Sequence, residues 1–400
     1  MTVTGSWERA ANGAMLLGAD GQLSQTIFAE MSALAVSTGA INLGQGFPDE
    51  DGPDEVLDAA RKAISDGVNQ YPPGNGLPVL RTAIAEHQQR FYGIDINPDT
   101  EVLATAGATE ALAATILALT SEGDEVITLE PFYDAYGAMI NYARATHVTV
   151  PLRSPDFQPD HDDIRAAFSG RTRLIILNSP HNPTGSVLDR ATLELIVELA
   201  HKYDALIVTD EVYEHITFGH EHIPIASLPG AFDRTISISS GGKTFNTTGW
   251  KIGWITAPQP LLQAIMAVKQ YLTYVNGAPL QVGIATGLGL PDSYFNDLAS
   301  GLARKRDTLS AGLRSAGFEV STPQAGYFII ADAAPLRISD AADFCRTLPD
   351  ISGVVGIPVT AFVHPQNHDD YKTLIRFAYC KKTDVLERAA AQLSGMKLRS

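Results

Sequence analysis

Cysteine is nearly absent from this chain: only Cys345 and Cys380 occur among 400 residues. Two isolated cysteines cannot build a disulfide framework, so we interpret both as core residues and expect a reducing cytoplasm. Residues 1–20 lack the basic start and long apolar segment of a signal peptide, and no apolar run reaches the length of a membrane span. The sequence therefore favours a cytoplasmic protein that does not cross a membrane.

Basic residues are also scarce. The chain has 29 Lys and Arg against 45 Asp and Glu, a formal net charge of −16. Phosphate backbones and anionic membranes require a basic face, so nucleic acid and membrane are excluded as expected partners. A hydrophobic content of 45% over this length is ample for a large core and for two or three domains.

Between residues 101 and 257, apolar strands alternate with helical stretches. This alternation predicts an α/β fold with a mostly parallel, seven-stranded sheet covered on both faces. Ligands bind such sheets beyond the carboxyl ends of the strands. The predicted strands are Val102–Thr105, Glu125–Leu129, Thr146–Val150, Arg173–Leu177, Ala205–Thr209, Thr235–Ser239 and Lys251–Ala257.

The remaining residues predict a smaller α+β domain formed by residues 23–48 and 291–400. Residues 49–290 would form the large, cofactor-binding domain, and residues 1–22, which lack clear periodicity, a flexible N-terminal arm. Asp292–Ser315 is predicted as one long helix, and the helical stretch Gln263–Leu288 is interrupted around Gly277.

A single lysine, Lys243, follows the predicted strand Thr235–Ser239 after a Gly-Gly break. Glycines allow close approach to a ligand, and a lysine of lowered pKa can form an imine with a carbonyl cofactor. A solvated lysine in a turn is the simpler alternative. A phosphate loop of the Walker A type is disfavoured, because that motif requires glycine where this chain has Ser237.

Polar residues follow other predicted strands. The segment Ala106–Thr109 begins a helix and suits an anion, although it is equally compatible with a plain cap. Asn182 lies in a rigid turn, and Asp210 follows an apolar strand, where it requires a cationic partner or caps a helix. Arg376 lies inside an apolar strand, where either a substrate carboxylate or a structural ion pair would satisfy it.

Taken together, these residues resemble the fold-type I pyridoxal-phosphate-dependent aminotransferases of class I/II, from Ile27 to about Leu393. The shared order is a phosphate turn, an aromatic residue, Asn, Asp-x-x-Tyr, Lys, a second basic residue and Arg. Residues 42–49 are most similar to the branch of kynurenine, methionine and glutamine aminotransferases. Residues 28–34, 69–74 and 277–279 are similar to N-succinyldiaminopimelate aminotransferases.

The resemblance implies a role for each matching residue. Lys243 would bind the aldehyde of pyridoxal 5′-phosphate covalently and then carry a proton during the reaction. Asp210 would pair with the ring nitrogen, which keeps the ring able to accept electrons. Asn182 and Tyr213 would hydrogen-bond the ring hydroxyl, and Tyr133 would stack on the ring.

The resemblance also implies the binding of the cofactor phosphate and the substrate. The amides of Ala108 and Thr109 would hold the phosphate, together with Ser240 and Lys251. Tyr71 would reach that phosphate from a neighbouring subunit, so a homodimer is expected. The remaining substrate-binding residues would be Arg376, which clamps the α-carboxylate, with Asn182, the Gly46 backbone and Phe28.

Two departures concern the substrate. Kynurenine aminotransferases have an aromatic–histidine pair where this chain has Asn276-Gly277, and tryptophan where it has Phe28. Smaller side chains there would admit an N-acylated diamino acid. We therefore predict an N-succinyl-LL-2,6-diaminopimelate aminotransferase of lysine biosynthesis that uses 2-oxoglutarate and glutamate.

Two alternatives remain. One is a kynurenine-, methionine- or glutamine-type aminotransferase with cysteine-S-conjugate β-lyase activity. The other is an aminotransferase-like sensor module, but such regulators carry a basic helix-turn-helix extension, and here only about twenty irregular residues precede the first predicted helix.

Three histidines, His215, His220 and His222, lie close together in the sequence. Their spacing is not that of a metalloprotease motif, so we interpret them as surface residues and expect no metal.

Overall fold

The computed structural model describes residues 3–18 and 21–397. Its largest sheet has seven strands in the order β2-β8-β7-β6-β5-β3-β4, and every pairing except those of β8 is parallel. The predicted mostly parallel seven-stranded α/β sheet is therefore confirmed. Its strands are β2 (Val102–Ala106), β3 (Glu125–Glu130), β4 (Thr146–Pro151), β5 (Thr172–Asn178), β6 (Leu206–Asp210), β7 (Thr235–Ser240) and β8 (Ile252–Thr256).

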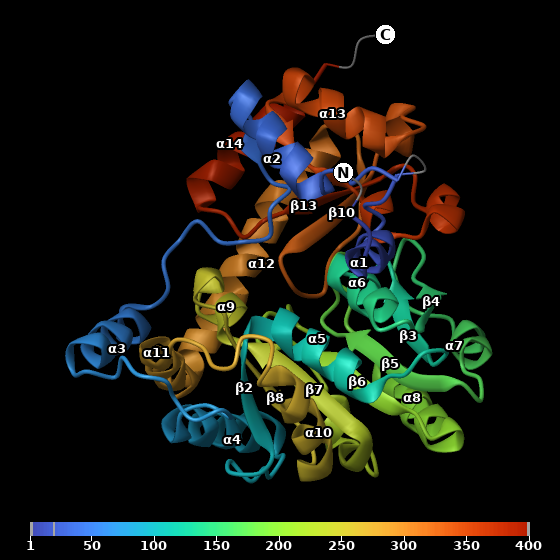
Figure 1. Cartoon of the computed structure of the whole chain (residues 1–400). Helices are drawn as coiled ribbons and strands as arrows, with labels where there is room; N and C mark the ends of the chain where they lie inside the picture. The colour runs from blue at the N-terminus through green and yellow to red at the C-terminus, as the bar shows by residue number, and fades with distance from the viewer. Residues whose placement is uncertain (1–2, 19–20, 398–400) are drawn as a thin grey trace.

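Both faces of this sheet are apolar because successive side chains of a strand point to opposite sides. In β5, Leu174 and Ile176 pack with helices on one face, whereas Ile175 and Leu177 pack with helices on the other. The first face is covered by α5 (Gly107–Leu119), α6 (Asp134–Tyr142) and α10 (Gln259–Lys269), and the second by α7 (His161–Ala167) and α8 (Arg190–Tyr203). Beside β2 and β8 lie α3 (Asp54–Ser65), α4 (Pro78–Tyr92) and α11 (Ala278–Leu288) (Figure 1).

A second, smaller group of elements lies above the large sheet in Figure 1. It contains an antiparallel sheet in the order β12-β13-β10-β9 and a short parallel pair, β1 with β11. The long helix α12 rises into this group, and its bounds, Asp292–Ser315, are those predicted. The other members are α2 (Ile27–Thr38), β1 (Ile41–Asn42), β9 (Glu319–Val320), β10 (Phe328–Asp332), α13 (Ala341–Ser352), β11 (Val354–Val355), β12 (Ile357–Pro358), β13 (Leu374–Ala378) and α14 (Thr383–Ser394).

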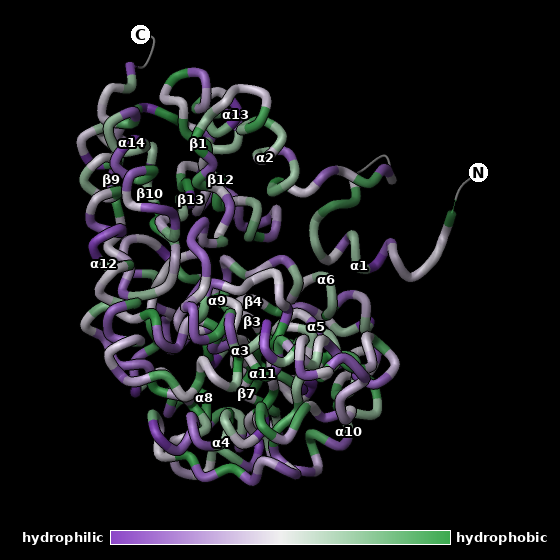
Figure 2. The backbone as a smooth tube through the Cα atoms, turned by 90° about the vertical axis from the view of Figure 1, so that its left-hand side faces the viewer, coloured by the Kyte–Doolittle hydropathy of each residue, from purple (hydrophilic) through white to green (hydrophobic). Residues whose placement is uncertain are grey.

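The N-terminal arm is more ordered than the sequence predicts. Residues Trp7–Gly13 form helix α1, and a β-bridge joins Leu17 to Leu23, so the expectation of an irregular arm is wrong there. Helix α1 packs on α6, where a side chain at Gly13 would meet the Gly137 carbonyl oxygen at 2.1 Å. The arm lies to one side of the main body in Figure 2. The helix buries small residues rather than a stripe of large apolar ones, which explains its weak periodicity. The predicted flexible arm also includes residues 1–2 and 19–20, which lie outside the described residues.

Across residues 3–18 and 21–397, no helix combines the length and apolar character needed to cross a bilayer.

The sheet topology brings the predicted polar residues to one edge. Strands β2, β3, β5, β6 and β7 run in the same direction, so their carboxyl ends meet there. Asn178 is paired in register with Asp210, and Arg376 of β13 reaches the loop after β5. This edge therefore faces the smaller sheet, which is where an α/β protein of this kind binds ligands.

Candidate active site

A cavity of about 230 Å³ lies at this edge of the sheet. Several of the residues lining it were predicted from the sequence as site residues. Those are Ala108, Thr109, Tyr133, Asn182, Asp210, Tyr213, Ser240, Lys243 and Lys251. The fold thus gathers segments that are more than a hundred residues apart.

Lys243 is held in a one-turn helix, α9 (Gly241–Thr244), rather than at the end of a strand as predicted. Strand β8 begins only at Ile252, because a short 3-10 turn separates it from α9. The Lys243 Nζ donates to the Gly46 carbonyl oxygen at 3.0 Å, and Tyr327 donates to the Lys243 carbonyl at 2.6 Å. Burial lowers the pKa of Lys243. A lysine of lowered pKa is a better nucleophile towards an aldehyde.

Asp210 ends β6 with a carboxylate that is only partly satisfied. Its Oδ2 accepts a hydrogen bond from Tyr136 at 2.7 Å, whereas its buried Oδ1 has no partner within the described chain. Burial raises the pKa of Asp210 to about 6, although the Tyr136 hydroxyl and the charge of Lys243 act in the opposite direction. A buried acceptor without a donor is costly, so Oδ1 suits a ligand that supplies an N–H group.

Arg376 lies in the middle of β13 and is almost fully buried. Its Nη1 donates to Asn182 Oδ1 at 3.1 Å and its Nη2 to the Gly44 carbonyl at 2.7 Å, while Nε has no partner within the described chain. Burial lowers the pKa of Arg376 to about 10, so the guanidinium stays charged at neutral pH. Both of these acceptors are uncharged oxygens, which leaves the guanidinium able to bind an anionic ligand.

One part of the cavity lining, around Gly107 and Lys251, has features that suit an anion. Helix α5 begins there, and its first residue, Gly107, has a φ of 73°, a conformation that few side chains tolerate. Lys251 lies against Gly107, since a side-chain carbon added there would come within 3.3 Å of its Nζ. Free amides at a helix start together with a cation favour a phosphate group.

Four of the predicted site residues do not line this cavity: Arg376, which reaches it through Asn182, and Gly46, Phe28 and Tyr71. Gly46 contacts it indirectly, through the hydrogen bond from Lys243, and a side chain there would meet the Phe328 ring at 2.3 Å. The Phe28 ring lies 5.4 Å from the Arg376 guanidinium carbon. Tyr71 is 81% exposed and contacts the ring of Tyr274.

Two residues that were not among the predicted site residues support Asp210. Tyr136 donates to its carboxylate, and the Asn178 Nδ2 donates to its main-chain oxygen at 2.8 Å. Tyr136 lies three residues after Tyr133, the N-cap residue of α6, and the two ring centroids are 5.7 Å apart in an edge-to-face arrangement. Asn178 stands in the sequence as the first of two amide side chains after an apolar strand, and in the fold it ends the strand beside β6.

The prediction that His215, His220 and His222 are surface residues is wrong for two of them. His220 is exposed, but His222 is buried and His215 is half-buried. The cause is tertiary, because α4 and α12 cover the turn after β6 through Phe91 and Phe295, which contact the His215 ring.

The comparison with known families assigns this site to a class. Residues 38–393 match the family model of the class I and II aminotransferases, and the chain belongs to this family. It is therefore an aminotransferase, an enzyme that moves an amino group between an amino acid and a 2-oxo acid, and its cofactor is pyridoxal 5′-phosphate.

Similar proteins include several aminotransferases. The probable N-succinyldiaminopimelate aminotransferase DapC of Mycobacterium tuberculosis is 49% identical over 92% of this chain and 95% of its own length. Human kynurenine–oxoglutarate transaminase 3 is 38% identical over 92% of this chain and 87% of its own length. The solved structure of N-succinyldiaminopimelate aminotransferase from M. tuberculosis has a TM-score of 0.91 at 47% identity, covering 99% of this chain and all of that one.

The residues in the cavity fit this cofactor. The unpartnered Asp210 Oδ1 suits a protonated ring nitrogen, Lys243 offers an amine for the aldehyde, and the start of α5 suits the phosphate. When bound, the cofactor supplies an aldehyde for amine exchange and a ring that withdraws electrons.

Proposed function

We propose that Lys243, Asp210 and Arg376 carry the three main tasks of the reaction. Lys243 holds the cofactor and moves the proton at the substrate Cα, because its amine has a lowered pKa and lies in the cavity. Asp210 keeps the ring nitrogen protonated through its free Oδ1. Arg376 binds the α-carboxylate through its charged, incompletely satisfied guanidinium. The convergence of these three groups at one edge of the sheet carries the proposal.

The remaining cavity residues orient the two ligands in this proposal. Asn182 and Tyr213 bind the ring hydroxyl, and Tyr133 stacks on the ring. The backbone of Gly46 and the ring of Phe28 border the substrate beside Arg376. Ala108, Thr109, Ser240 and Lys251 hold the phosphate, as the start of α5 and the cation beside it suggest.

We infer that the amino donor is N-succinyl-LL-2,6-diaminopimelate and the acceptor 2-oxoglutarate, as part of lysine biosynthesis. The 49% identity to a probable aminotransferase of this type supports the inference. The side chain of Asn276 also leaves room, because it is turned onto backbone: Nδ2 donates to the Thr105 and Lys251 carbonyls at 2.6 and 3.1 Å.

A kynurenine- or methionine-type activity, with β-lyase activity on cysteine S-conjugates, is the second candidate. The observation that favours it is the apolar setting of Arg376, whose guanidinium lies 4.0 Å from the Phe328 ring centre and 4.6 Å from that of Phe362. Aromatic walls of this kind suit an apolar or aromatic side chain.

An amino-donor screen with 2-oxoglutarate tests both candidates. The donors are N-succinyl-LL-2,6-diaminopimelate, methionine, glutamine and kynurenine, and the readout is kcat/KM from glutamate formation. We expect the succinylated donor to exceed the others by at least about tenfold, since a recognised distal group contributes 1.4 kcal/mol or more. A higher value for kynurenine or methionine would replace the first candidate by the second.

We also propose that the working unit is a homodimer. Tyr71 (81% exposed), Tyr271 (83%), Leu272 and Tyr274 form an exposed apolar group on one chain. Such groups mark interfaces, and Tyr71 would then contact the cofactor phosphate of the partner subunit. Light scattering should give twice the chain mass, and Tyr71→Phe should weaken cofactor affinity without changing that mass. A monomeric active enzyme would refute the assignment.

We propose, finally, that residues 49–290 form a large cofactor-binding domain and that residues 23–48 join 291–400 in a smaller one. Helix α2 packs on α13, and β1 pairs with β11. These contacts support grouping residues 23–48 with the C-terminal part. Limited proteolysis should cut first near residues 48–53 and 290. Early cuts inside either unit instead would contradict these boundaries.

A further inference from the structure

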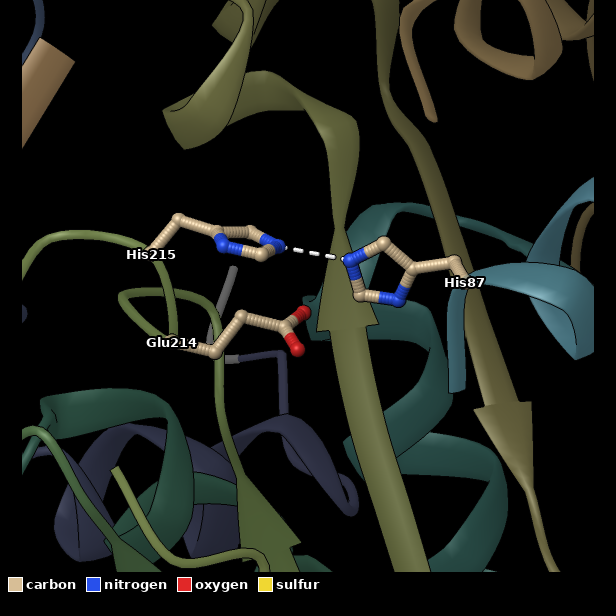
Figure 3. Close-up of side chains that lie close together, drawn as sticks. All are labelled: His87, Glu214 and His215. Atoms are coloured by element: carbon tan, nitrogen blue, oxygen red, sulfur yellow. Dashed lines mark hydrogen bonds between the residues drawn. The ribbon is translucent and has the colours of Figure 1, made fainter. Parts of the chain in front are cut away.

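A second group of polar side chains, two of them buried and one half-buried, includes two residues of the turn that follows Asp210. Figure 3 shows the rings of His87 and His215 facing each other, with the carboxylate of Glu214 beside them. One ligand atom from each of the three residues lies within 4.8 Å of the others, and the two Nε2 atoms are 2.6 Å apart. His87 belongs to α4, whereas the other two come from the turn after β6.

These side chains are the kinds that bind divalent transition metals. Imidazole nitrogen and carboxylate oxygen are the usual ligands of Zn²⁺, which binds nitrogen at about 2.0–2.1 Å in a tetrahedral arrangement. Two such nitrogens around one ion are separated by about 3.3 Å. The two Nε2 atoms already point at each other. Ring movements that increase their separation by less than about 1 Å would therefore admit the ion.

The surroundings orient the carboxylate for this purpose. Glu214 Oε2 accepts a hydrogen bond from Tyr92 at 2.7 Å, and Oε1 accepts one from Ser239 at 2.5 Å. Carboxylate ligands of metal ions are commonly held in this way by outer hydrogen bonds.

A second observation points to a missing ligand. His222 is buried, yet neither of its ring nitrogens has a hydrogen-bond partner within the described chain; its Nε2 lies 3.5 Å from the Glu211 carboxylate. His87 Nδ1 is also buried without a partner there. His222 lines, with Glu214 and His215, a cavity of about 630 Å³. This cavity offers an entry path and a place for a further ligand or a water molecule.

We propose that His87, Glu214 and His215 form a binding site for one divalent transition-metal ion of the Zn²⁺ type, with His222 beside the open coordination position. This proposal replaces the sequence-based expectation that the protein binds no metal. It joins α4 to the turn that runs from Asp210 through Tyr213, and it therefore stabilises the segment that carries two cofactor-facing side chains.

The experiment uses the dialysed holoenzyme, with its cofactor absorbance monitored so that loss of cofactor is recognised. Calorimetric titration with Zn²⁺ should give about one ion per chain, and Co²⁺ should give the intense visible absorption of a tetrahedral site. His87→Gln and His215→Gln should each weaken Zn²⁺ binding by at least about 10–100-fold, the loss that removal of even a supporting group causes. Zn²⁺ should raise the Tm of the native enzyme but not of these variants.

His201→Gln is the matched control, because His201 is an exposed histidine outside the proposed site whose Nε2 lies 2.9 Å from the Gly230 carbonyl oxygen. It should bind Zn²⁺ as the native enzyme does. Should these variants misfold, the calorimetric stoichiometry and the Co²⁺ spectrum of the native enzyme still decide. The proposal is overturned if the native enzyme binds no stoichiometric ion, if Co²⁺ gives only the weak spectrum of an octahedral ion, or if all variants bind equally.

Discussion

Glu130 and Asp210 are both buried acids that end strands of the same sheet, but their surroundings differ. Glu130 accepts hydrogen bonds on both oxygens: from the His364 amide at 2.7 Å, from Asn367 at 2.6 Å and from Thr149 at 3.2 Å. Asp210, which lines the cavity, accepts one side-chain donor among the described residues, and its buried Oδ1 has no partner there. A fully satisfied acid joins segments of the fold, whereas a half-satisfied one is available to a ligand.

Of the changes near Asp210, Lys243→Ala should have the largest effect, because it removes the amine that binds the cofactor. We expect turnover to fall by at least about 10³-fold, with loss of the absorbance of the covalently bound cofactor. Steady-state assay and the visible spectrum measure both. Retention of either would remove Lys243 from its proposed role.

The pair Asp210→Asn and Glu130→Gln tests the comparison directly. A neutral amide cannot hold a proton on the ring nitrogen, so Asp210→Asn should lower kcat by about 10²–10³-fold. Glu130→Gln places an N–H group among donors and should lower the free energy of unfolding by about 1–3 kcal/mol, with kcat kept within about threefold. Denaturant unfolding and kcat are measured for both variants. Equal losses of kcat would break the distinction between the two acids.

The stability of the cofactor-free protein should depend on pH through Asp210. Its pKa is about 6 in the folded chain and 3.8 ordinarily, so the folded state binds more protons between these values. The free energy of unfolding should therefore fall as pH rises from about 4 to 6, by about 3 kcal/mol in total. Asp210→Asn should lack this component of the pH profile. If the native protein and Asp210→Asn differ in the free energy of unfolding by the same amount throughout this pH range, the raised pKa of Asp210 is contradicted.

Arg376→Lys should weaken substrate binding more than it slows chemistry. A lysine keeps the charge but loses the planar fork that binds a carboxylate through two hydrogen bonds. We expect KM for the amino donor to rise by about 10–50-fold, with a smaller change in kcat. A KM equal to that of the native enzyme would refute carboxylate binding by this residue.

Tyr136→Phe should have the smallest effect and sharpens the account of Asp210. It removes the 2.7 Å hydrogen bond that helps to keep the carboxylate ionised. We expect kcat to fall by about 3–10-fold while KM for the amino donor changes little. A loss as large as that of Asp210→Asn would mean that Tyr136 contacts the ligands itself.

The sequence alone determined the strands, the long helix and the family of this protein. Apolar strands that alternate with helical stretches predicted the mostly parallel sheet, because helices cover both faces of such strands. Lys243 stood out because it follows a Gly-Gly break at the end of a strand, and Arg376 because its charge does not suit an apolar strand. Tertiary structure decided the rest: the donor from Tyr136 to Asp210, the packing of α1 on α6, and the contact between His87 and His215, which are 128 residues apart. These contacts depend on how separate helices pack onto a sheet, and no local pattern of residues records that arrangement.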